Sequence, residues 1–184
     1  MTDAVAVPDE VLVAQVLDGE TDAFAELVRR HQRRVLRIGL GFFKNEEDAA
    51  DFAQDVMLKA YTGLASFRGA SKFSTWLTRI AYNAAINGTK RKPKYDPLET
   101  DPEDVRELDP EDRQIRDETV AALRKAMGEL PPKYAVCLDM YFYLGMKYGD
   151  ISEATGFPVN TIKSHVFRAK RELRKALGGE EVEE

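Results

Sequence analysis

The sequence has 184 residues, of which 43% are hydrophobic and 32% charged, and its formal net charge is −5. Its single cysteine, Cys137, excludes a disulfide framework and a cysteine-based zinc site, and two histidines are too few for a histidine metal cluster. No apolar run is long enough to cross a membrane, and the N-terminus lacks a basic stretch followed by an apolar core. We therefore expect a soluble cytoplasmic protein without membrane insertion and without a metal or cofactor.

The net charge is unevenly distributed along the chain. Residues 1–94 carry a net charge of +2 and residues 119–179 a net charge of +5, whereas residues 95–118 hold 11 acids against 3 bases and residues 180–184 hold four acids. The acidic segment 95–118 has three prolines and few large apolar residues, so it cannot bury enough surface to fold alone. We expect two domains, at 1–94 and 119–179, joined by an acidic linker at 95–118 and followed by an acidic tail at 180–184. A solvated surface loop within one domain is the alternative interpretation of the linker.

Apolar residues recur at helical intervals through the first domain, and no alternating strand pattern competes with them. The helices that this spacing predicts lie near 9–18, 22–43, 46–64 and 73–89. A loop is expected at 65–72. Thr21 and Asn45 stand at N-cap positions, and the acids that follow Asn45 suit the positive end of a helix dipole. The first domain is thus predicted to be a four-helix domain.

The second domain is also predicted to be helical, which makes the expected fold all-α with two small domains. Asp109 and Pro110 form a cap followed by proline at the first helical position, and Gly128 is expected to stop the helix that they open. The predicted helices run from Pro110 to Met127, from Pro132 to Gly145, over 147–155 and from Asn160 to Leu177.

The last two predicted helices have the spacing of a DNA-binding helix-turn-helix. This motif needs a small residue four positions before a glycine in the turn and a branched apolar residue about six positions after it. Ser152, Gly156 and Ile162 meet that spacing. Residues 158–177 contain six bases and one acid, an imbalance typical of a helix that contacts phosphates. A solvated basic helix in an ordinary bundle is the competing interpretation.

The position of each outward side chain along the final helix predicts its role on DNA. Residues near the start of the helix reach base edges, and later residues hold phosphates. The residues predicted to read bases are Asn160, Lys163, Ser164 and Phe167. The residues predicted to hold phosphates are Arg168, Arg171 and Arg174.

The first domain carries a further and more specific set of motifs. It contains the pattern D-x-x-Q-D-V at 51–56, the tetrapeptide S-F-R-G at 66–69 and the pattern F-S-T-W-L-x-R-I-A-x-N at 73–83. In these motifs the chain resembles region two of bacterial sigma factors of the extracytoplasmic function group. The second domain resembles region four of the same family, through L-P-P-K at 130–133 and T-I-K-S-H-V-F-R-A-K at 161–170.

The resemblance implies a transcription initiation factor with no catalysis of its own. The first domain would dock on core RNA polymerase, through the clamp of its largest subunit, and would recognise and open the −10 promoter element. The second domain would recognise the −35 element through the base-reading and phosphate-holding residues of the final helix. The resemblance also implies an anti-sigma protein as a partner and no small-molecule substrate.

The resemblance assigns two further sets of residues in the first domain. Those implied in polymerase docking are Asp51, Gln54 and Asp55. Those implied in −10 recognition are Phe67, Arg68, Ser71, Lys72, Asn83, Asn87, Lys90 and Arg91. Phe73 and Trp76 lie on the apolar face of the predicted helix 73–89, and we interpret them as core residues, with DNA contact as the alternative. Many family members carry charged residues where this chain has Asn87 and Gly88, so the −10 base preference stays open.

An ordinary helix-turn-helix regulator, whose N-terminal bundle senses a ligand or dimerises, is the alternative class of function. Such a regulator would bind operator DNA alone, whereas a sigma factor needs core polymerase for specific transcription. The motif over Phe67–Asn83 favours the sigma interpretation. An enzyme is disfavoured because the sequence shows no clustered acid/base or metal ligands.

Overall fold

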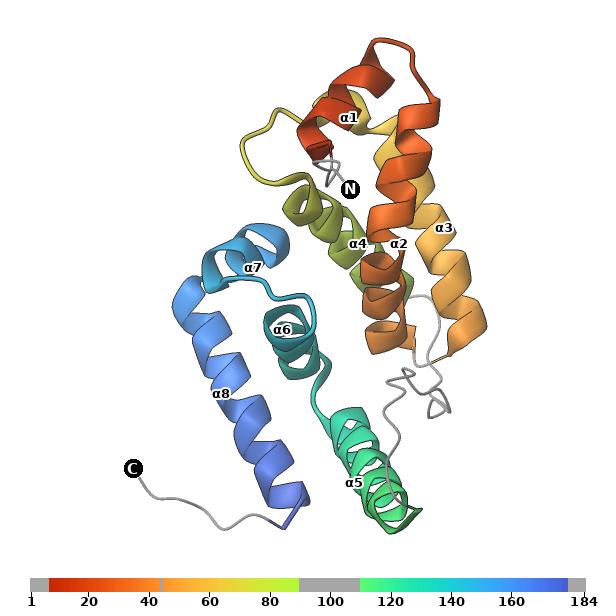
Figure 1. The fold of residues 1–184 in the computed structure, drawn as a ribbon. Helices are drawn as coiled ribbons and strands as arrows, with labels where there is room; N and C mark the ends of the chain where they lie inside the picture. Colours follow the sequence, from red (N-terminus) through yellow and green to blue (C-terminus); the bar gives the residue numbers. More distant parts are fainter. Residues whose placement is uncertain (1–6, 44, 90–109, 179–184) are drawn as a thin grey trace, which may run out of the picture.

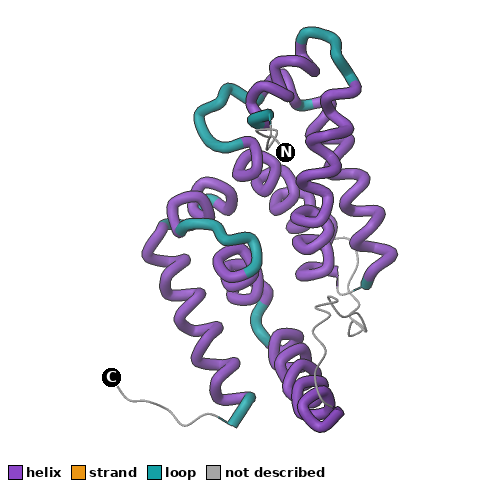
Figure 2. Tube along the Cα trace, viewed as in Figure 1, coloured by secondary structure: helices purple, strands orange, loops and turns teal. Residues whose placement is uncertain are grey.

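The protein is seen here in a computed structural model that describes residues 7–43, 45–89 and 110–178, and every regular element in these ranges is a helix. Figure 1 shows two groups of helices, one from each half of the chain. Figure 2 shows the short loops that join successive helices. The N-terminal elements are α1 (Asp9–Leu17), α2 (Asp22–Phe43), α3 (Glu46–Thr62), the 3₁₀ turn η1 (Leu64–Ser66) and α4 (Phe73–Thr89). The C-terminal elements are α5 (Pro110–Glu129), α6 (Pro132–Phe142), α7 (Tyr148–Thr155) and α8 (Val159–Ala176). The all-α fold class is confirmed.

The four helices predicted in the N-terminal half are confirmed, although α3 ends at Thr62 rather than near residue 64. Asn45 caps α3 as expected, because its Oδ1 accepts a hydrogen bond of 2.9 Å from the backbone N–H of Asp48. Gly39 lets α2 and α3 pack closely. A Cβ atom at Gly39 would lie 2.8 Å from the Phe52 ring and 3.2 Å from the Ala49 Cα, so a larger residue would push the two helices apart.

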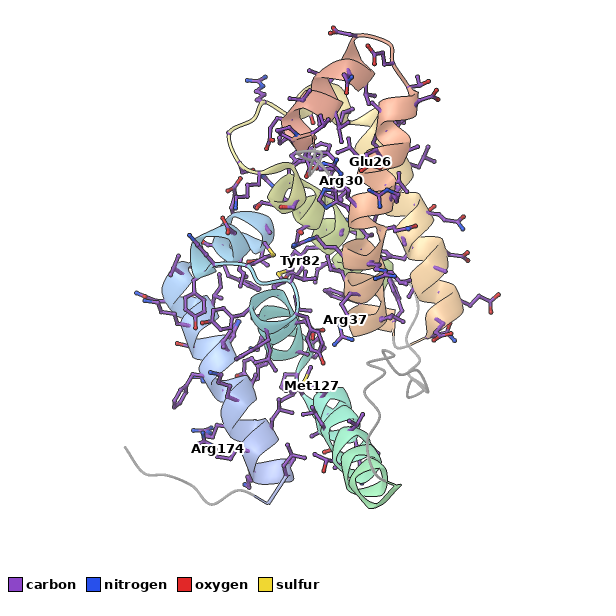
Figure 3. All side chains as sticks on the ribbon, viewed as in Figure 1. Glu26, Arg30, Arg37, Tyr82, Met127 and Arg174 are labelled. Carbon is purple, nitrogen blue, oxygen red and sulfur yellow. The ribbon has the colours of Figure 1, made fainter. Side chains whose placement is uncertain are left out.

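A group of charged side chains fixes α1 to α2. The Arg30 guanidinium donates hydrogen bonds to Asp9, at 3.0 Å, and to Glu26, at 2.7 Å, and Figure 3 shows Glu26 and Arg30 close together on α2. His31 Nε2 lies 2.7 Å from the second carboxylate oxygen of Asp9. Hydrogen bonds from Arg29 and Arg30 lower the pKa of Glu26 to about 2. These cations therefore have partners within the N-terminal half.

Two predicted helix ends in the C-terminal half are wrong. Gly128 does not stop α5, which continues to Glu129; the prolines that follow end it, since the residue before a proline avoids the helical region. α6 ends at Phe142 rather than Gly145, and the chain turns at Gly145 with a φ of +61°. α5 begins at Pro110 as predicted, so its backbone covers 110–118 of the segment interpreted as a linker. The preceding residues 90–109 and the acidic tail 180–184 lie outside the described residues.

The helix-turn-helix geometry is present in α7 and α8. Gly156 ends α7 in the left-handed conformation, with a φ of +77°, which only glycine adopts without strain. The Ser152 hydroxyl donates a 2.7 Å hydrogen bond to the carbonyl of Phe157, and this bond braces the turn. Ile162, near the start of α8, is completely buried. The three residues whose spacing predicted the motif thus each have a structural role in it.

Both halves contribute to one continuous apolar core. α4 packs against α7 and α2 packs against α6 across the boundary between the halves, as Figure 1 shows for α4 and α7. Tyr82 of α4 lies on this boundary, with its ring centroid 6.4 Å from that of Phe157. Deeper in the C-terminal half, the buried Cys137 Sγ lies 3.6 Å from His165 Nδ1.

Candidate nucleic-acid interface

α8 presents a continuous polar face to solvent. Its apolar side chains point inward: Ile162, Val166 and Ala169 are buried, while Leu173 is half-buried. All of the residues that the sequence predicted to read bases or hold phosphates are exposed. They are Asn160, Lys163, Ser164, Phe167, Arg168, Arg171 and Arg174. Figure 3 shows Arg174 on the C-terminal part of this helix. The structure therefore brings the predicted set together on one helix face.

The cations of α8 have few partners within the described residues. Arg168 donates a 3.1 Å hydrogen bond to the hydroxyl of Tyr134, and Arg171 lies 3.5 Å from Glu172, a neighbour that is itself exposed. The bond from Arg168 lowers the pKa of Tyr134. No ion pair to Lys163 or Arg174 is found in the described part of the chain. These side chains are available to phosphates because internal ion pairs do not occupy them.

Phe167 is the most exposed large apolar side chain of α8, with 65% of its surface accessible. It lines a shallow hollow together with Lys163, Ser164, Arg168 and Arg171. An aromatic ring surrounded by cations and a hydroxyl suits contact with a base edge or a thymine methyl group inside the major groove. The exposed ring is difficult to explain as a packing residue of an isolated domain.

A second polar surface lies on the loop before α4 and on α4 itself. Arg68 and Lys72 are exposed in the loop, Ser71 is half-buried, and Gly69 turns the chain with a φ of +68°. Phe67 is also half-buried, because its ring packs at 5.7 Å from Phe73 and 5.5 Å from Trp76. These three aromatic rings thus pack the loop against α4.

The exposed face of α4 carries two amides and one arginine. Asn83 and Asn87 are exposed one helical turn apart, and Arg79 precedes Asn83 on the same face. Phe73 is buried, and Trp76 is half-buried beside it, so the larger part of each ring belongs to the core. Lys90 and Arg91, also predicted at this surface, lie outside the described residues. Arg79 matches the motif at 73–83 but was not predicted as a site residue, although its position four residues before Asn83 is a usable signal.

α3 presents a third exposed surface, which is acidic and partly apolar. Asp51, Gln54 and Asp55 are all exposed on it, as the sequence predicted. Leu58, with 62% of its surface exposed, and Tyr61, with 42%, continue the same face toward the end of the helix. These two residues were not predicted from the sequence, although they follow Asp51 and Asp55 at helical intervals. A mixed apolar and acidic helix face is suited to docking a partner protein with complementary basic groups.

Residues on the boundary between the two halves were also missed. Arg37 of α2 lies 3.3 Å from Asp139 of α6, and Arg34 donates a 3.1 Å hydrogen bond to the carbonyl of Leu144, two residues beyond the end of α6. Burial lowers the pKa of Arg34. Sequence periodicity could not reveal these contacts, since they join positions more than 100 residues apart.

The described ranges hold neither a metal centre nor a membrane-spanning helix. Among residues 7–43, 45–89 and 110–178, no three His, Cys, Asp or Glu side chains converge as metal ligands would. In the same ranges, no helix combines the length and apolarity that a membrane span requires.

Family models match both halves of the chain. The model of sigma-70 region 2 matches residues 27–94, and the model of sigma-70 region 4 matches residues 121–173. The first match contains α3, the loop and α4, and the second contains the helix-turn-helix.

Curated relatives match nearly the whole chain. The RNA polymerase sigma-H factor of Pseudomonas aeruginosa is 34% identical, over 92% of this chain and 93% of its own length. The ECF RNA polymerase sigma factor SigW of Bacillus subtilis is 30% identical, over 90% and 94%. Among solved structures, CnrH in complex with the cytosolic domain of CnrY has a TM-score of 0.70 and 23% identity, over 92% of this chain and 97% of that one. RpoE in complex with the anti-sigma factor NepR from Bartonella quintana has the same TM-score, with 20% identity, over 86% and 98%.

Proposed function

Because this chain belongs to the bacterial RNA polymerase sigma factors of the extracytoplasmic function group, and so directs the polymerase to promoters, we propose that its three exposed surfaces have separate tasks in initiation. The observation that carries the proposal is the exposed basic face of α8, the second helix of a helix-turn-helix. We set aside the alternative function, an ordinary helix-turn-helix regulator, because that class does not explain the match to sigma-70 region 2 at residues 27–94.

α8 reads the −35 element in this proposal. Residues in its first two turns, above all Lys163, enter the major groove and contact base edges, with Phe167 beside them. Arg168, Arg171 and Arg174 lie further along the exposed face and hold phosphates. Among the described residues few internal contacts compete for these arginines, which supports the assignment. To bind phosphate, Arg168 gives up a hydrogen bond to the Tyr134 hydroxyl and Arg171 a 3.5 Å contact with the exposed Glu172.

The loop before α4 and the exposed face of α4 act on the −10 element. Opening the duplex requires a base to leave the stack and be held outside it. Arg68 and Lys72 supply charge beside the strand, and Asn83 and Asn87 supply amides that pair with base edges. The ring of Phe67 shapes the floor of the loop, because it already packs against the rings of Phe73 and Trp76.

The exposed face of α3 docks on the clamp of core polymerase. Asp51, Gln54 and Asp55 supply its polar contacts, and Leu58 supplies an apolar contact that strengthens on burial. An anti-sigma protein is a further proposed partner, since one structural neighbour, RpoE of Bartonella quintana, is a sigma factor in complex with the anti-sigma factor NepR. The proposed boundaries are 1–94 for the docking and −10 domain, 95–118 for the linker, 119–179 for the −35 domain and 180–184 for the tail. We place the protein in the cytoplasm, with no catalytic activity of its own.

Run-off transcription with purified core polymerase tests the assignment. The wild-type chain is expected to direct transcripts from a promoter selected from random DNA. Asp51→Lys combined with Asp55→Lys abolishes copurification with core polymerase, whereas Glu10→Lys, an exposed acid of α1, serves as the control and leaves it intact. Full core binding by the double variant would contradict the docking surface.

A further inference from the structure

The charged group that fixes α1 to α2 lies next to the loop that precedes α4. α1 packs against η1 as well as against α2, and Figure 1 shows α1 beside η1. Leu12 and Val13 of α1 and Leu64 of η1 are all buried. Because η1 leads directly into the loop, α1 adjoins the proposed −10 surface, although none of its residues has been assigned to that surface.

The backbone of the loop is held at its two ends. At the first end, Phe67 donates its N–H to the carbonyl that begins η1, at 2.9 Å. At the second end, the carbonyl of Lys72 accepts hydrogen bonds from the N–H groups of Thr75, at 3.0 Å, and Trp76, at 3.1 Å. Between these anchors, no hydrogen bond to residues 68–71 is found within the part of the chain that the structure describes. The shape of the loop therefore depends on how its two ends are placed.

Both ends of the loop rest on the ring of Phe73. This side chain follows Lys72 directly as the first residue of α4, and only 2% of its surface is exposed. Its ring centroid lies 5.7 Å from that of Phe67 and 5.6 Å from that of Trp76. A displacement of Phe73 would consequently move the start and the end of the loop together.

His31 of α2 supports Phe73 from the side of the charged group. The two ring centroids lie 5.3 Å apart, and the rings are inclined by 57°. His31 Nε2 lies 2.7 Å from Asp9 Oδ2, and the side chains are only 12% and 21% exposed. Rotation of an imidazole about its χ2 torsion is soft, so the hydrogen bond to Asp9 sets the direction in which the ring faces Phe73. Arg30 holds the other carboxylate oxygen of Asp9 at 3.0 Å, which fixes the carboxylate in turn.

We propose that Asp9 and His31 are positioning residues for recognition of the −10 element. They hold Phe73 in place, and Phe73 keeps residues 67–72 in the shape that receives a base. The proposal rests on the proposed function of this loop, and neither Asp9 nor His31 touches DNA in it. A loop that is ordered before it binds loses less conformational entropy on binding and discriminates more sharply between bases.

The single tryptophan of the chain reports on the loop in the free protein. Trp76 is half-buried, and its ring packs 5.5 Å from that of Phe67. Two variants of the full-length chain test the support in different ways. His31→Gln keeps an amide that donates to Asp9 but has no ring, and Asp9→Ala leaves the ring without its hydrogen bond. Each is expected to shift the Trp76 emission to longer wavelength and to increase its quenching by acrylamide.

The matched control is Glu26→Ala. Its carboxylate belongs to the same charged group but bonds Arg29 and Arg30. This variant should lose stability while the emission and the quenching of Trp76 stay as in the wild type. Circular dichroism confirms that all three variants are folded at the temperature of the measurement.

Discrimination between −10 bases tests the consequence for recognition. Core polymerase carrying each chain is titrated with a single strand of the −10 element from a promoter selected on the wild-type chain, and with the same strand changed at one base. His31→Gln and Asp9→Ala should each lower the ratio of the two affinities by about fivefold, because a hydrogen-bonded base contact contributes discrimination of this order. Glu26→Ala should keep the wild-type ratio. A loss of folded protein reduces the amount of active complex but not this ratio, so the ratio separates positioning from stability.

The two measurements also separate this proposal from the proposed function. Trp76 signals equal to the wild type in both variants would overturn the positioning role, and so would unchanged discrimination in variants whose Trp76 signal has moved. A wild-type complex that does not distinguish the two strands would instead contradict the proposed function of the loop. The Trp76 signal of the free chain would then decide alone whether Asp9 and His31 hold the loop.

Discussion

α2 and α8 are both basic amphipathic helices, yet they use their cations in opposite ways. α2 carries five arginines and two acids, and α8 carries six bases and one acid. In α2, Arg30 bonds Glu26 and Asp9, and Arg37 pairs with Asp139. In α8, the cations contact a tyrosine hydroxyl, an aromatic ring and one exposed neighbour within the described residues. The number of bases in a helix is therefore a poor guide to DNA binding unless one knows how many of them are already paired.

The largest expected effect comes from removing the arginines of α8. Replacing Arg168, Arg171 and Arg174 together by alanine should weaken binding to a −35 duplex by roughly 100-fold and reduce the salt slope of log K by about 2.7, because three phosphate contacts are lost. Fluorescence anisotropy across a range of salt concentrations measures both quantities. The matched α2 variant, Arg29→Ala with Arg33→Ala, is expected to bind within twofold of the wild type. Equal losses of DNA affinity from the α8 and α2 variants would contradict the proposed difference between the two helices.

A smaller effect, confined to one base pair, is expected for Lys163. Lys163→Ala should change the preferred base at a single position of the −35 element, with a discrimination of about 1–3 kcal/mol, since the side chain lies near the start of α8. Arg171→Ala, in contrast, should weaken all sequences uniformly. Measuring the affinity of each variant for a library of −35 sites distinguishes the two effects. If both variants lost affinity equally for every site in the library, the division into a base-reading Lys163 and a phosphate-holding Arg171 would be refuted.

The cations of α2 should matter for stability instead. Asp9→Asn removes the ionised partner of Arg30 and His31 and is expected to lower the free energy of unfolding by about 1–2 kcal/mol, with no change in −35 affinity. Urea denaturation followed by circular dichroism measures the first quantity. A variant that unfolds as the wild type does but binds DNA less well would show that α2 takes part in recognition.

The smallest effect expected is a pH dependence of the N-terminal half. The pKa of Glu26 is lowered from 4.5 to about 2, so the stability that this carboxylate contributes is fully present above pH 4.5 and is lost as the pH falls toward 2. Glu26→Gln should therefore reduce the dependence of the unfolding midpoint on pH between these values. Because the Glu26 carboxylate is exposed, the variant and the wild type are expected to differ only slightly in this pH dependence. Unfolding midpoints that change equally with pH in both proteins would contradict the prediction.

The sequence predicted the parts of the fold that depend on local pattern. Helical spacing located α2 and α4 to the residue, and the Ser152, Gly156 and Ile162 spacing identified the turn before α8. Helix ends set by competing signals were less predictable: Gly128 costs a helix little compared with a following proline, so α5 passes through it.

The candidate sites, too, could be predicted only where they depend on local sequence spacing. Residues that share one helix face, such as Asp51 and Asp55, could be grouped from their spacing alone. The half-burial of Phe67 could not, because its neighbours Phe73 and Trp76 cover it only after the loop has folded back onto α4. The contacts of Arg37 with Asp139 and Tyr143 depend on how the two halves pack together, and no local sequence pattern predicts that packing.

The position of Cys137 bears on how the protein responds to oxidants. The side chain is completely buried, and burial raises the pKa of its thiol to about 11, so almost none of it is thiolate at neutral pH. Peroxides and disulfides react with thiolates, and they must also reach the sulfur. As the only cysteine of this sequence, Cys137 leaves the folded chain without a reactive thiol, so a thiol-based oxidative signal that alters its activity must be received by another protein and passed on by binding.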